Sequence, residues 1–284
     1  MSYLILNNNL PIIQNIGQKN ETFLFASTDS EGLFTKNKEV MGNDWYYYEK
    51  PIEYKYNSWG YRSKELDEIK GDFMIVFGCS YTEGIGLYEE DMWSTKVGKE
   101  LGLEVLNMGM GSTSIDFQYY NTMLLFEHLL KINKLPKLVI YQWPFQYRTT
   151  FSFVSDYSKE GTSLGFELFC GAFPTEMYPA NSKLYGQWYL HGFLENKGEL
   201  IKQRDLYIKL SNIIWKSKDV KVLNWTFRCG FYKDTPNFLS DDFIVDEIVD
   251  EHGEVKARDL SHHGHLSQNL VLDYVLKKLN NGVS

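Results

Sequence analysis

The 284-residue sequence lacks three features that would assign it to large classes of proteins. No apolar run approaches the ~20 residues that cross a bilayer. No basic segment precedes the first apolar positions, as it does in a signal peptide. Positive charge is also scarce, because 29 Lys and Arg face 37 Asp and Glu for a net charge of -8. These absences predict a cytoplasmic protein with no signal peptide, no membrane partner and no general affinity for nucleic acids.

Cysteine is scarce as well, since Cys79, Cys170 and Cys229 are odd in number and far apart. No pair has the short spacing of a zinc site or a disulfide framework, so a reducing compartment is the simpler context. Cys79 stands directly before a serine and is itself a candidate nucleophile, but a free cysteine more often behaves as a small buried apolar residue. Hydrophobic residues make up 43% of the chain and aromatic residues 16%, enough for a sizeable core.

Strands and helices alternate through most of the chain. Uncharged runs rich in β-branched and aromatic residues predict buried strands, and apolar side chains at helical spacing predict the helices between them. The predicted strands are 73–77, 104–107, 138–141 and 220–224, and the predicted helices are 91–101, 115–132, 205–216 and 266–279. Such alternation builds a mostly parallel sheet with helices on both faces, which is the three-layer α/β/α class.

Two segments interrupt this rhythm. Residues 1–70 lack a clear period, apart from an alternating strand at 52–56, and predict an arm or small β unit packed on a main domain at 71–284. Residues 145–202, approximately, are dense in Phe, Tyr, Gly and Ser and too long for an ordinary connection, so we expect an insertion over the sheet edge. Its aromatic side chains could stack on a sugar or acyl group, or form the insertion's own small core.

One serine and one histidine cluster carry the candidate chemistry. Ser80 follows the first buried strand, at the edge where open α/β sheets bind their ligands. Serine becomes a nucleophile when a neighbouring base, usually histidine, takes its proton. Among six histidines, only the C-terminal cluster has a carboxylate at short spacing, where Asp259 can hold one ring nitrogen of His262 and leave the other for Ser80. A metal site that adds His263 and His265 is disfavoured, because these histidines are too close in sequence to converge.

Three short blocks resemble those of the SGNH/GDSL hydrolase superfamily. Residues 78–84, Gly-Cys-Ser-Tyr-Thr-Glu-Gly, resemble the first block, which carries the nucleophile. Residues 107–114, Asn-Met-Gly-Met-Gly-Ser-Thr-Ser, are similar to the second block, and residues 259–262, Asp-Leu-Ser-His, to the last. The blocks occur in the family's order, and the resemblance covers roughly residues 73–144 and 256–280.

The resemblance implies a flavodoxin-like SGNH fold and a serine esterase or deacylase that acts through an acyl-enzyme and needs no metal or organic cofactor. Ser80 would be the nucleophile, His262 the base and Asp259 the residue that orients it. The amides of Ser80 and Gly111 would form the oxyanion hole, with Gly109 as the competing second donor. The implied partner is a small acyl ester or a glycan, and O-acetyl on a carbohydrate is our preferred substrate.

The third block departs from the family pattern. Gly-x-Asn-Asp should follow the third strand, yet residues 142–145 are Gln-Trp-Pro-Phe. Gln142 could replace the missing oxyanion donor, and Tyr81, Trp143 and Arg148 are candidates for substrate contacts. Because loss of one donor costs ~10²–10³ in turnover, a glycan-binding or structural protein without the chemistry stays an alternative, as does an acyltransferase with the same triad.

A looser resemblance concerns the origin of the chain. Residues 57–62, Asn-Ser-Trp-Gly-Tyr-Arg, together with residues 142–144 and Arg148, are similar to an uncharacterised SGNH-like group in large tailed phages. That resemblance would place the protein in the host cytoplasm or in the virion.

Overall fold

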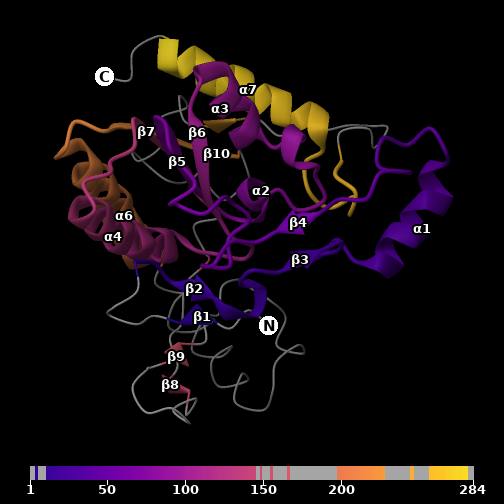
Figure 1. The fold of residues 1–284 in the computed structure, drawn as a ribbon, viewed down its shortest axis with the longest axis horizontal. Coiled ribbons are helices and arrows are strands. Elements are labelled where there is room, and N and C mark those ends of the chain that lie inside the picture. Colours follow the sequence, from indigo (N-terminus) through magenta and orange to yellow (C-terminus); the bar gives the residue numbers. More distant parts are fainter. Residues whose placement is uncertain are drawn as a thin grey trace.

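A computed structural model describes most of the chain. The described residues are 4–5, 11–144, 148, 154–155, 165–166, 197–227, 244–245 and 256–280. Most of the predicted insertion at 145–202 therefore lies outside them. Within them, a five-stranded sheet lies between two layers of helices (Figure 1). The prediction of a three-layer α/β/α fold with a mostly parallel sheet is confirmed.

The central sheet has the strand order β11-β10-β7-β5-β6, and all neighbouring strands are parallel. Its strands are β5 (Phe73–Gly78), β6 (Glu104–Gly109), β7 (Leu138–Gln142), β10 (Lys221–Phe227) and β11 (Ile244–Val245). From β5 the chain first builds β6 on one side and then β7 on the other. This order is the flavodoxin-like one, with its switch point between β5 and β7, where ligands bind beyond the carboxyl ends of the strands.

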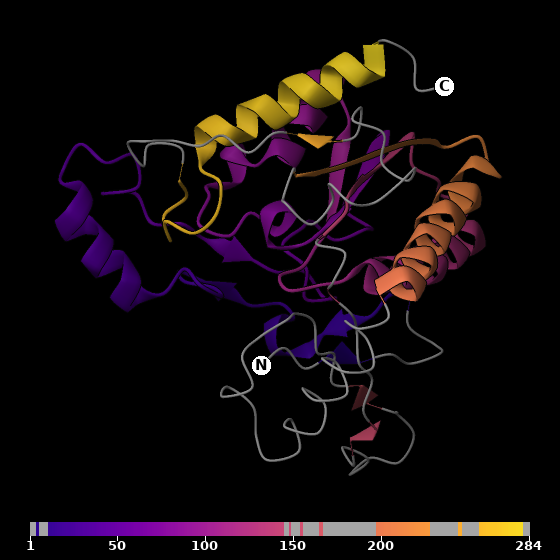
Figure 2. The ribbon, with the colours of Figure 1, turned by 180° about the vertical axis from the view of Figure 1, so that it is seen from behind.

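Two pairs of helices cover the sheet. Helices α3 (Trp93–Leu101) and α7 (His265–Asn280) lie on one face, and α4 (Ile115–Lys131) and α6 (Lys197–Lys216) lie on the other (Figures 1 and 2). The members of each pair contact one another. None of the described helices is long and apolar enough to cross a membrane.

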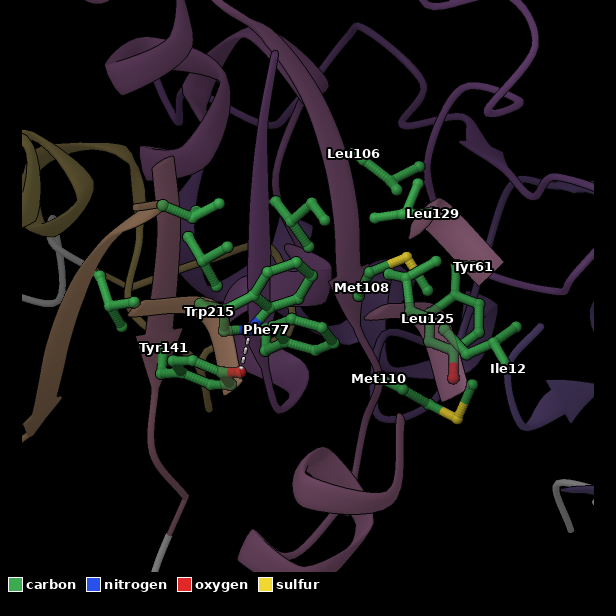
Figure 3. Packing of buried hydrophobic residues seen from close by; sticks show 14 of the residues in the cluster. Ile12, Tyr61, Phe77, Leu106, Met108, Met110, Leu125, Leu129, Tyr141 and Trp215 are labelled. Carbon is green, nitrogen blue, oxygen red and sulfur yellow. Dashed lines mark hydrogen bonds between the residues drawn. The ribbon is translucent and has the colours of Figure 1, made fainter. Parts of the chain in front are cut away.

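The alternation of side chains along β5 supplies both halves of the core. Ile75 and Phe77 belong to the cluster beneath α4 and α6, whereas Met74 and Val76 belong to the cluster beneath α3 and α7. Figure 3 shows the first cluster, in which Phe77 lies near Tyr141, the acceptor of a 2.7 Å hydrogen bond from the indole of Trp215. Because both faces of the strand are buried, its sequence is an uninterrupted apolar run.

The N-terminal segment packs against this domain with little regular structure of its own. Its elements are β1 (Leu4–Ile5), β2 (Gln14–Asn15), η1 (Ile16–Gln18), β3 (Thr22–Phe23), α1 (Glu31–Met41) and β4 (Tyr54–Lys55). Ile12 and Tyr61 join the core beneath α4. β1 also pairs with β9 (Gly165–Phe166), which pairs with β8 (Val154–Ser155). The strand predicted at 52–56 is limited to the two residues of β4, and α1 was not predicted.

Candidate active site

A tight turn at the end of β5 presents Ser80. Cys79 is the N-cap of the single-turn helix α2 (Ser80–Glu83), and Gly84 ends it in the left-handed region, with φ of 78°. A Cβ at Gly109 would lie 2.5 Å from the backbone nitrogen of Glu83, so only glycine lets β6 approach α2 this closely. These close approaches fix the position of Ser80 at the switch point between β5 and β7.

A second turn presents the acid and the base. Leu260 has a positive φ of 54°, and the amides of Ser261 and His262 each donate a 3.0 Å hydrogen bond to Oδ1 of Asp259. Asp259 thus caps its own turn, as Asp residues commonly do. The turn places the imidazole of His262 beside the Asp259 carboxylate.

The structure brings Ser80, His262 and Asp259 into one hydrogen-bonded chain. Nδ1 of His262 lies 2.6 Å from Oδ2 of Asp259, and Nε2 lies 2.8 Å from Oγ of Ser80, 182 positions away in the sequence. An ionised carboxylate only accepts hydrogen bonds, so Nδ1 carries the ring proton and Nε2 accepts from the serine hydroxyl. This tautomer is the one a general base requires.

Asp259 keeps its negative charge in this setting. Its burial acts to raise the pKa, but hydrogen bonds and charge from His262, together with a hydrogen bond from Thr28, outweigh burial and lower the pKa of Asp259 to about 2. The carboxylate therefore stays ionised at any pH where His262 works as a base, and it can stabilise the imidazolium that forms.

The two candidate amides of the second block differ in their partners. The amide of Gly109 donates to Oδ1 of Asn107 at 2.9 Å, within its own segment. The amide of Gly111 donates to Oε2 of Glu83 at 2.6 Å, and a Cβ on Gly111 would lie 3.8 Å from Cβ of Ser80. The amide of Ser80 opens α2 and has no acceptor within that helix. Both glycine amides thus have an acceptor within the protein, and the roles of Ser80, Gly111 and Gly109 as oxyanion donors stay predictions.

Glu83 is a charged residue of this site that the sequence motifs do not predict. Its side chain is buried, Oε1 accepts a 2.9 Å hydrogen bond from the hydroxyl of Tyr56, and Oε2 accepts from Gly111. Burial raises the pKa of Glu83, although these two hydrogen bonds and the charges of Arg62 and His262 oppose the change. One signal was present in the sequence, because Glu83 stands three positions after Ser80 and hence on the same side of a helical turn.

Gln142 supports the nucleophile turn from β7. Its Oε1 accepts a 3.1 Å hydrogen bond from the amide of Cys79, and its Nε2 donates to the carbonyl oxygen of Trp143 at 3.0 Å. Both ends of the amide are thus used inside the protein. A role as third oxyanion donor stays a prediction, and it would require Nε2 to leave the Trp143 carbonyl.

The three predicted substrate contacts lie in different surroundings. Tyr81 is half-buried and flanks the base, with its ring centroid 5.1 Å from that of His262. Trp143 is fully buried, stacks on Tyr141 and donates from its indole to Asn224 at 2.8 Å. A buried ring offers no surface to a substrate, so Trp143 is a core residue, in place of the predicted contact. Arg148 is half-buried, and its role stays a prediction.

The remaining histidines of the cluster have other surroundings. His263 is buried, and its burial together with the charges of Lys256 and His262 lowers its pKa to about 4. His265 stacks on Tyr46 with ring centroids 4.0 Å apart. Within the described part of the chain, no group of three or more His, Cys, Asp or Glu residues could hold a metal ion.

Comparison of the sequence with models of protein families and with curated proteins found no match. Three solved structures are similar in shape. An esterase from Pseudoalteromonas sp. is 12% identical with a TM-score of 0.39, over 74% of this chain and 98% of the esterase. A protein from Desulfitobacterium hafniense, described as lipolytic and of the G-D-S-L family, is 16% identical with a TM-score of 0.31. The match covers 73% of this chain and 99% of that protein. A GDSL-like lipase from Bacteroides ovatus is 11% identical with a TM-score of 0.32, and the match covers 74% of this chain and 53% of the lipase.

Proposed function

We propose that this protein is a serine hydrolase of the SGNH type that cleaves a small acyl ester through a covalent acyl-enzyme. The observation that supports the proposal is the hydrogen-bonded chain from Ser80 through His262 to Asp259, with heavy-atom distances of 2.8 Å and 2.6 Å. A protein that only bound a ligand would not need these three side chains to form a continuous hydrogen-bonded chain. The second alternative, a structural or glycan-binding protein, therefore has less support.

In the proposed mechanism each residue of the hydrogen-bonded chain has one role. Oγ of Ser80 attacks the ester carbonyl carbon while Nε2 of His262 takes the hydroxyl proton, and Asp259 stabilises the resulting imidazolium. The negative charge moves to the carbonyl oxygen, which the amides of Ser80 and Gly111 can stabilise. When the tetrahedral intermediate collapses, His262 gives its proton to the leaving alcohol. Water then attacks the acyl-Ser80 ester while His262 takes its proton, and as the acid leaves, His262 gives that proton to Oγ of Ser80.

The acyl acceptor separates hydrolysis from transfer. An acyltransferase would use the same three residues, with a hydroxyl of a second substrate in place of water. A small acyl group such as acetyl, carried by a carbohydrate, is the proposed substrate because the predicted insertion is rich in aromatic residues. Product analysis with water alone and with added sugar acceptors would distinguish the two reactions.

Active-site labelling tests the proposal. The purified protein would be incubated with short-chain aryl esters and separately with a fluorophosphonate, followed by mass spectrometry of the labelled peptide. We expect ester turnover and a phosphonyl adduct on Ser80, both abolished in Ser80→Ala and retained in Ser217→Ala, a distant exposed serine. Absence of turnover and of labelling in the folded wild-type protein would overturn the proposal.

A further inference from the structure

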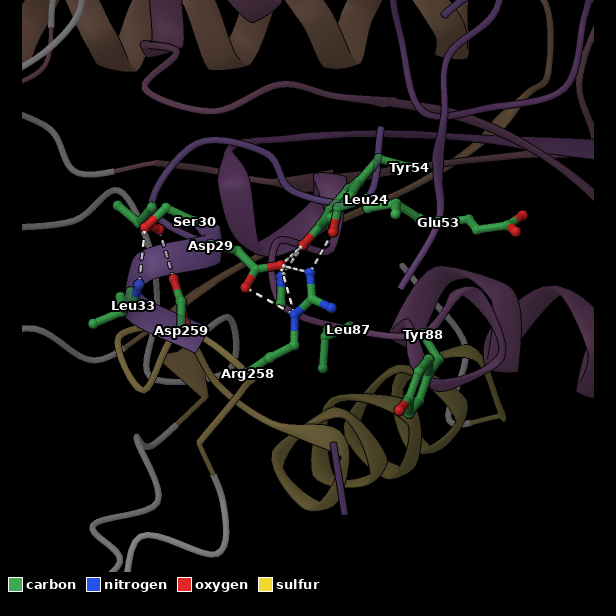
Figure 4. Close-up of polar contacts among 12 residues, drawn as sticks. Leu24, Asp29, Ser30, Leu33, Glu53, Tyr54, Leu87, Tyr88, Arg258 and Asp259 are labelled. Carbon is green, nitrogen blue, oxygen red and sulfur yellow. Dashed lines mark hydrogen bonds and ion pairs between the residues drawn. The ribbon is translucent and has the colours of Figure 1, made fainter. Parts of the chain in front are cut away.

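The N-terminal arm forms hydrogen bonds and an ion pair with the segment that carries Asp259, the acid of the triad. Arg258 donates from Nε to Oδ1 of Asp29 at 2.9 Å and from Nη2 to Oδ2 at 2.5 Å, and Nη2 also donates to the carbonyl oxygen of Leu24 at 2.5 Å (Figure 4). Both charged side chains are almost fully buried. Asn37 of α1 adds a 2.9 Å hydrogen bond to the carbonyl oxygen of Arg258. The residue directly before Asp259 is therefore fixed by side chains and backbone of the arm.

The same arm reaches the acid itself. Oγ1 of Thr28 donates a 2.5 Å hydrogen bond to Oδ2 of Asp259, a residue 231 positions away. This oxygen also accepts the hydrogen bond from Nδ1 of His262. Oδ1 accepts the two amides of the turn, so the carboxylate has four donors for its roughly four lone-pair sites. Thr28 supplies the only one of these four that comes from outside residues 259–262.

Thr28 is held in place by its own short turn. The amide of Asp29 donates to the carbonyl oxygen of Ala26 at 3.0 Å, and Ser27 has a positive φ of 57°. Asp29, the next residue, is anchored by Arg258 and by the hydroxyl of Tyr54, which donates to Oδ2 at 2.5 Å. With its neighbour fixed in this way, the hydroxyl of Thr28 reaches Asp259 at little further cost in conformational entropy.

We propose that Thr28 is a positioning residue of the active site, which orients the Asp259 carboxylate and through it the imidazole of His262. This inference rests on the proposed function, because it assigns Thr28 a part in the same triad. It also assigns a task to the arm, which completes the acid side of the site from outside the α/β domain. Thr28 itself is exposed, but the carboxylate that it contacts is buried, so a valine of equal volume at this position would keep water from taking the place of the hydroxyl.

Three variants separate the hydroxyl from the shape of the side chain. Thr28→Val keeps the volume and removes the donor, Thr28→Ser keeps the donor, and Ser30→Ala alters the same arm at the cap of α1, where Ser30 accepts from Leu33. We expect kcat to fall about tenfold in Thr28→Val with KM unchanged, since one hydrogen bond to a charged group is worth about one order of magnitude. Thr28→Ser should stay within about threefold of wild type by the same estimate, and Ser30→Ala should match wild type.

A second readout does not depend on turnover. The proton between Nδ1 of His262 and Asp259 should give a low-field ¹H resonance, and loss of the Thr28 donor should shift it in Thr28→Val but not in Ser30→Ala. If this resonance shifts while the wild-type protein neither turns over esters nor labels at Ser80, the proposed function fails and the positioning role stands. If the resonance and kcat of Thr28→Val match wild type, or if Thr28→Ser is as slow as Thr28→Val, the inference is overturned.

Discussion

The amide of Gly111 donates a hydrogen bond of 2.6 Å to a carboxylate oxygen of Glu83, one helical turn after the nucleophile. A donor that serves an oxyanion would have to exchange this partner for the substrate oxygen. Whether the exchange is easy depends on the charge of Glu83, because an ionised carboxylate competes for the amide and repels the developing oxyanion. The groups that face this carboxyl are Tyr56, Arg62 and His262.

Glu83 should therefore impose a decline in activity on the alkaline side. Burial raises its pKa, so the carboxyl is neutral at low pH and ionises as the pH rises through that raised value. We expect kcat/KM of the wild-type protein to fall by about tenfold above this pH, which is part of the ~10²–10³ in turnover that one oxyanion donor contributes. Glu83→Gln should lack this fall. The free energy of unfolding should also fall as the pH rises through this value, because a raised carboxyl pKa favours the folded state only while the group is protonated.

The comparison requires pH profiles from about 5 to 9 for wild type, Glu83→Gln and a control. Glu90→Gln is a suitable control, because the Glu90 side chain is 61% exposed and pairs with Lys50 at the surface. Identical alkaline limbs in wild type and Glu83→Gln would show that the Glu83 carboxylate does not oppose catalysis.

Gln142 should matter more to stability than to turnover. Gln142→Ala removes the acceptor of the buried Cys79 amide, which we expect to cost about 2 kcal/mol of unfolding free energy. Turnover should fall by less than about tenfold, because the catalytic donors remain. Denaturant unfolding and ester kinetics on the same samples would check this. A fall of ~10² or more in kcat with unchanged stability would instead assign Gln142 as the third oxyanion donor.

Asp29 should be one of the most sensitive positions outside the triad. Asp29→Ala leaves the Arg258 guanidinium buried without its carboxylate, and we expect a loss of about 3–5 kcal/mol in unfolding free energy. As a control, Glu90→Ala breaks an exposed pair with Lys50 and should cost less than about 1 kcal/mol. Equal melting temperatures for the two variants would contradict the role of the arm described above.

Gly109 should tolerate no side chain. Its Cβ would lie 2.5 Å from the nitrogen of Glu83 and 2.6 Å from the carbonyl carbon of Thr82, so Gly109→Ala must displace α2 from β6. We expect a loss of about 1–3 kcal/mol in stability and a larger relative loss of Ser80 labelling. Gly32→Ala is the matched control, because that helical glycine has open space around its Cβ position and should gain about 0.5–1 kcal/mol. Normal labelling in Gly109→Ala would show that this contact does not set the position of Ser80.

The parts of the fold that followed from the sequence are those where burial on both faces leaves a continuous apolar run. The predicted strands at 73–77 and 138–141 differ from β5 and β7 by one residue each. Helix α1 was missed because its hydrophobic face is weak, and among its residues only Asn37 is buried. Helix α6 begins at Lys197 where the prediction began at 205, since its first turns mix charged and apolar residues without a clear period.

The residues of the site likewise divide into those that the sequence predicts and those that it does not. Ser80, Asp259 and His262 could be predicted because each stands in a short local pattern, a strand-to-turn junction or an acid three positions before a histidine. Thr28 could not be predicted, because a single threonine in an aperiodic segment carries no signal of a contact 231 positions away. Trp143 was misassigned because a residue just past a strand end can turn inward as readily as outward, and here the space beside Tyr141 holds it.

Covalent labelling of Ser80 tests the central claim most directly. A fluorophosphonate would be added to wild type, Ser80→Ala and His262→Ala over a range of pH, and the modified residue identified by mass spectrometry. We predict rapid and stoichiometric modification of Ser80 in wild type, none in Ser80→Ala, and a rate lower by ~10³ or more without the base. Modification of Ser80 at the same rate in wild type and in His262→Ala would contradict the account, because the 2.8 Å hydrogen bond between these residues would then activate nothing.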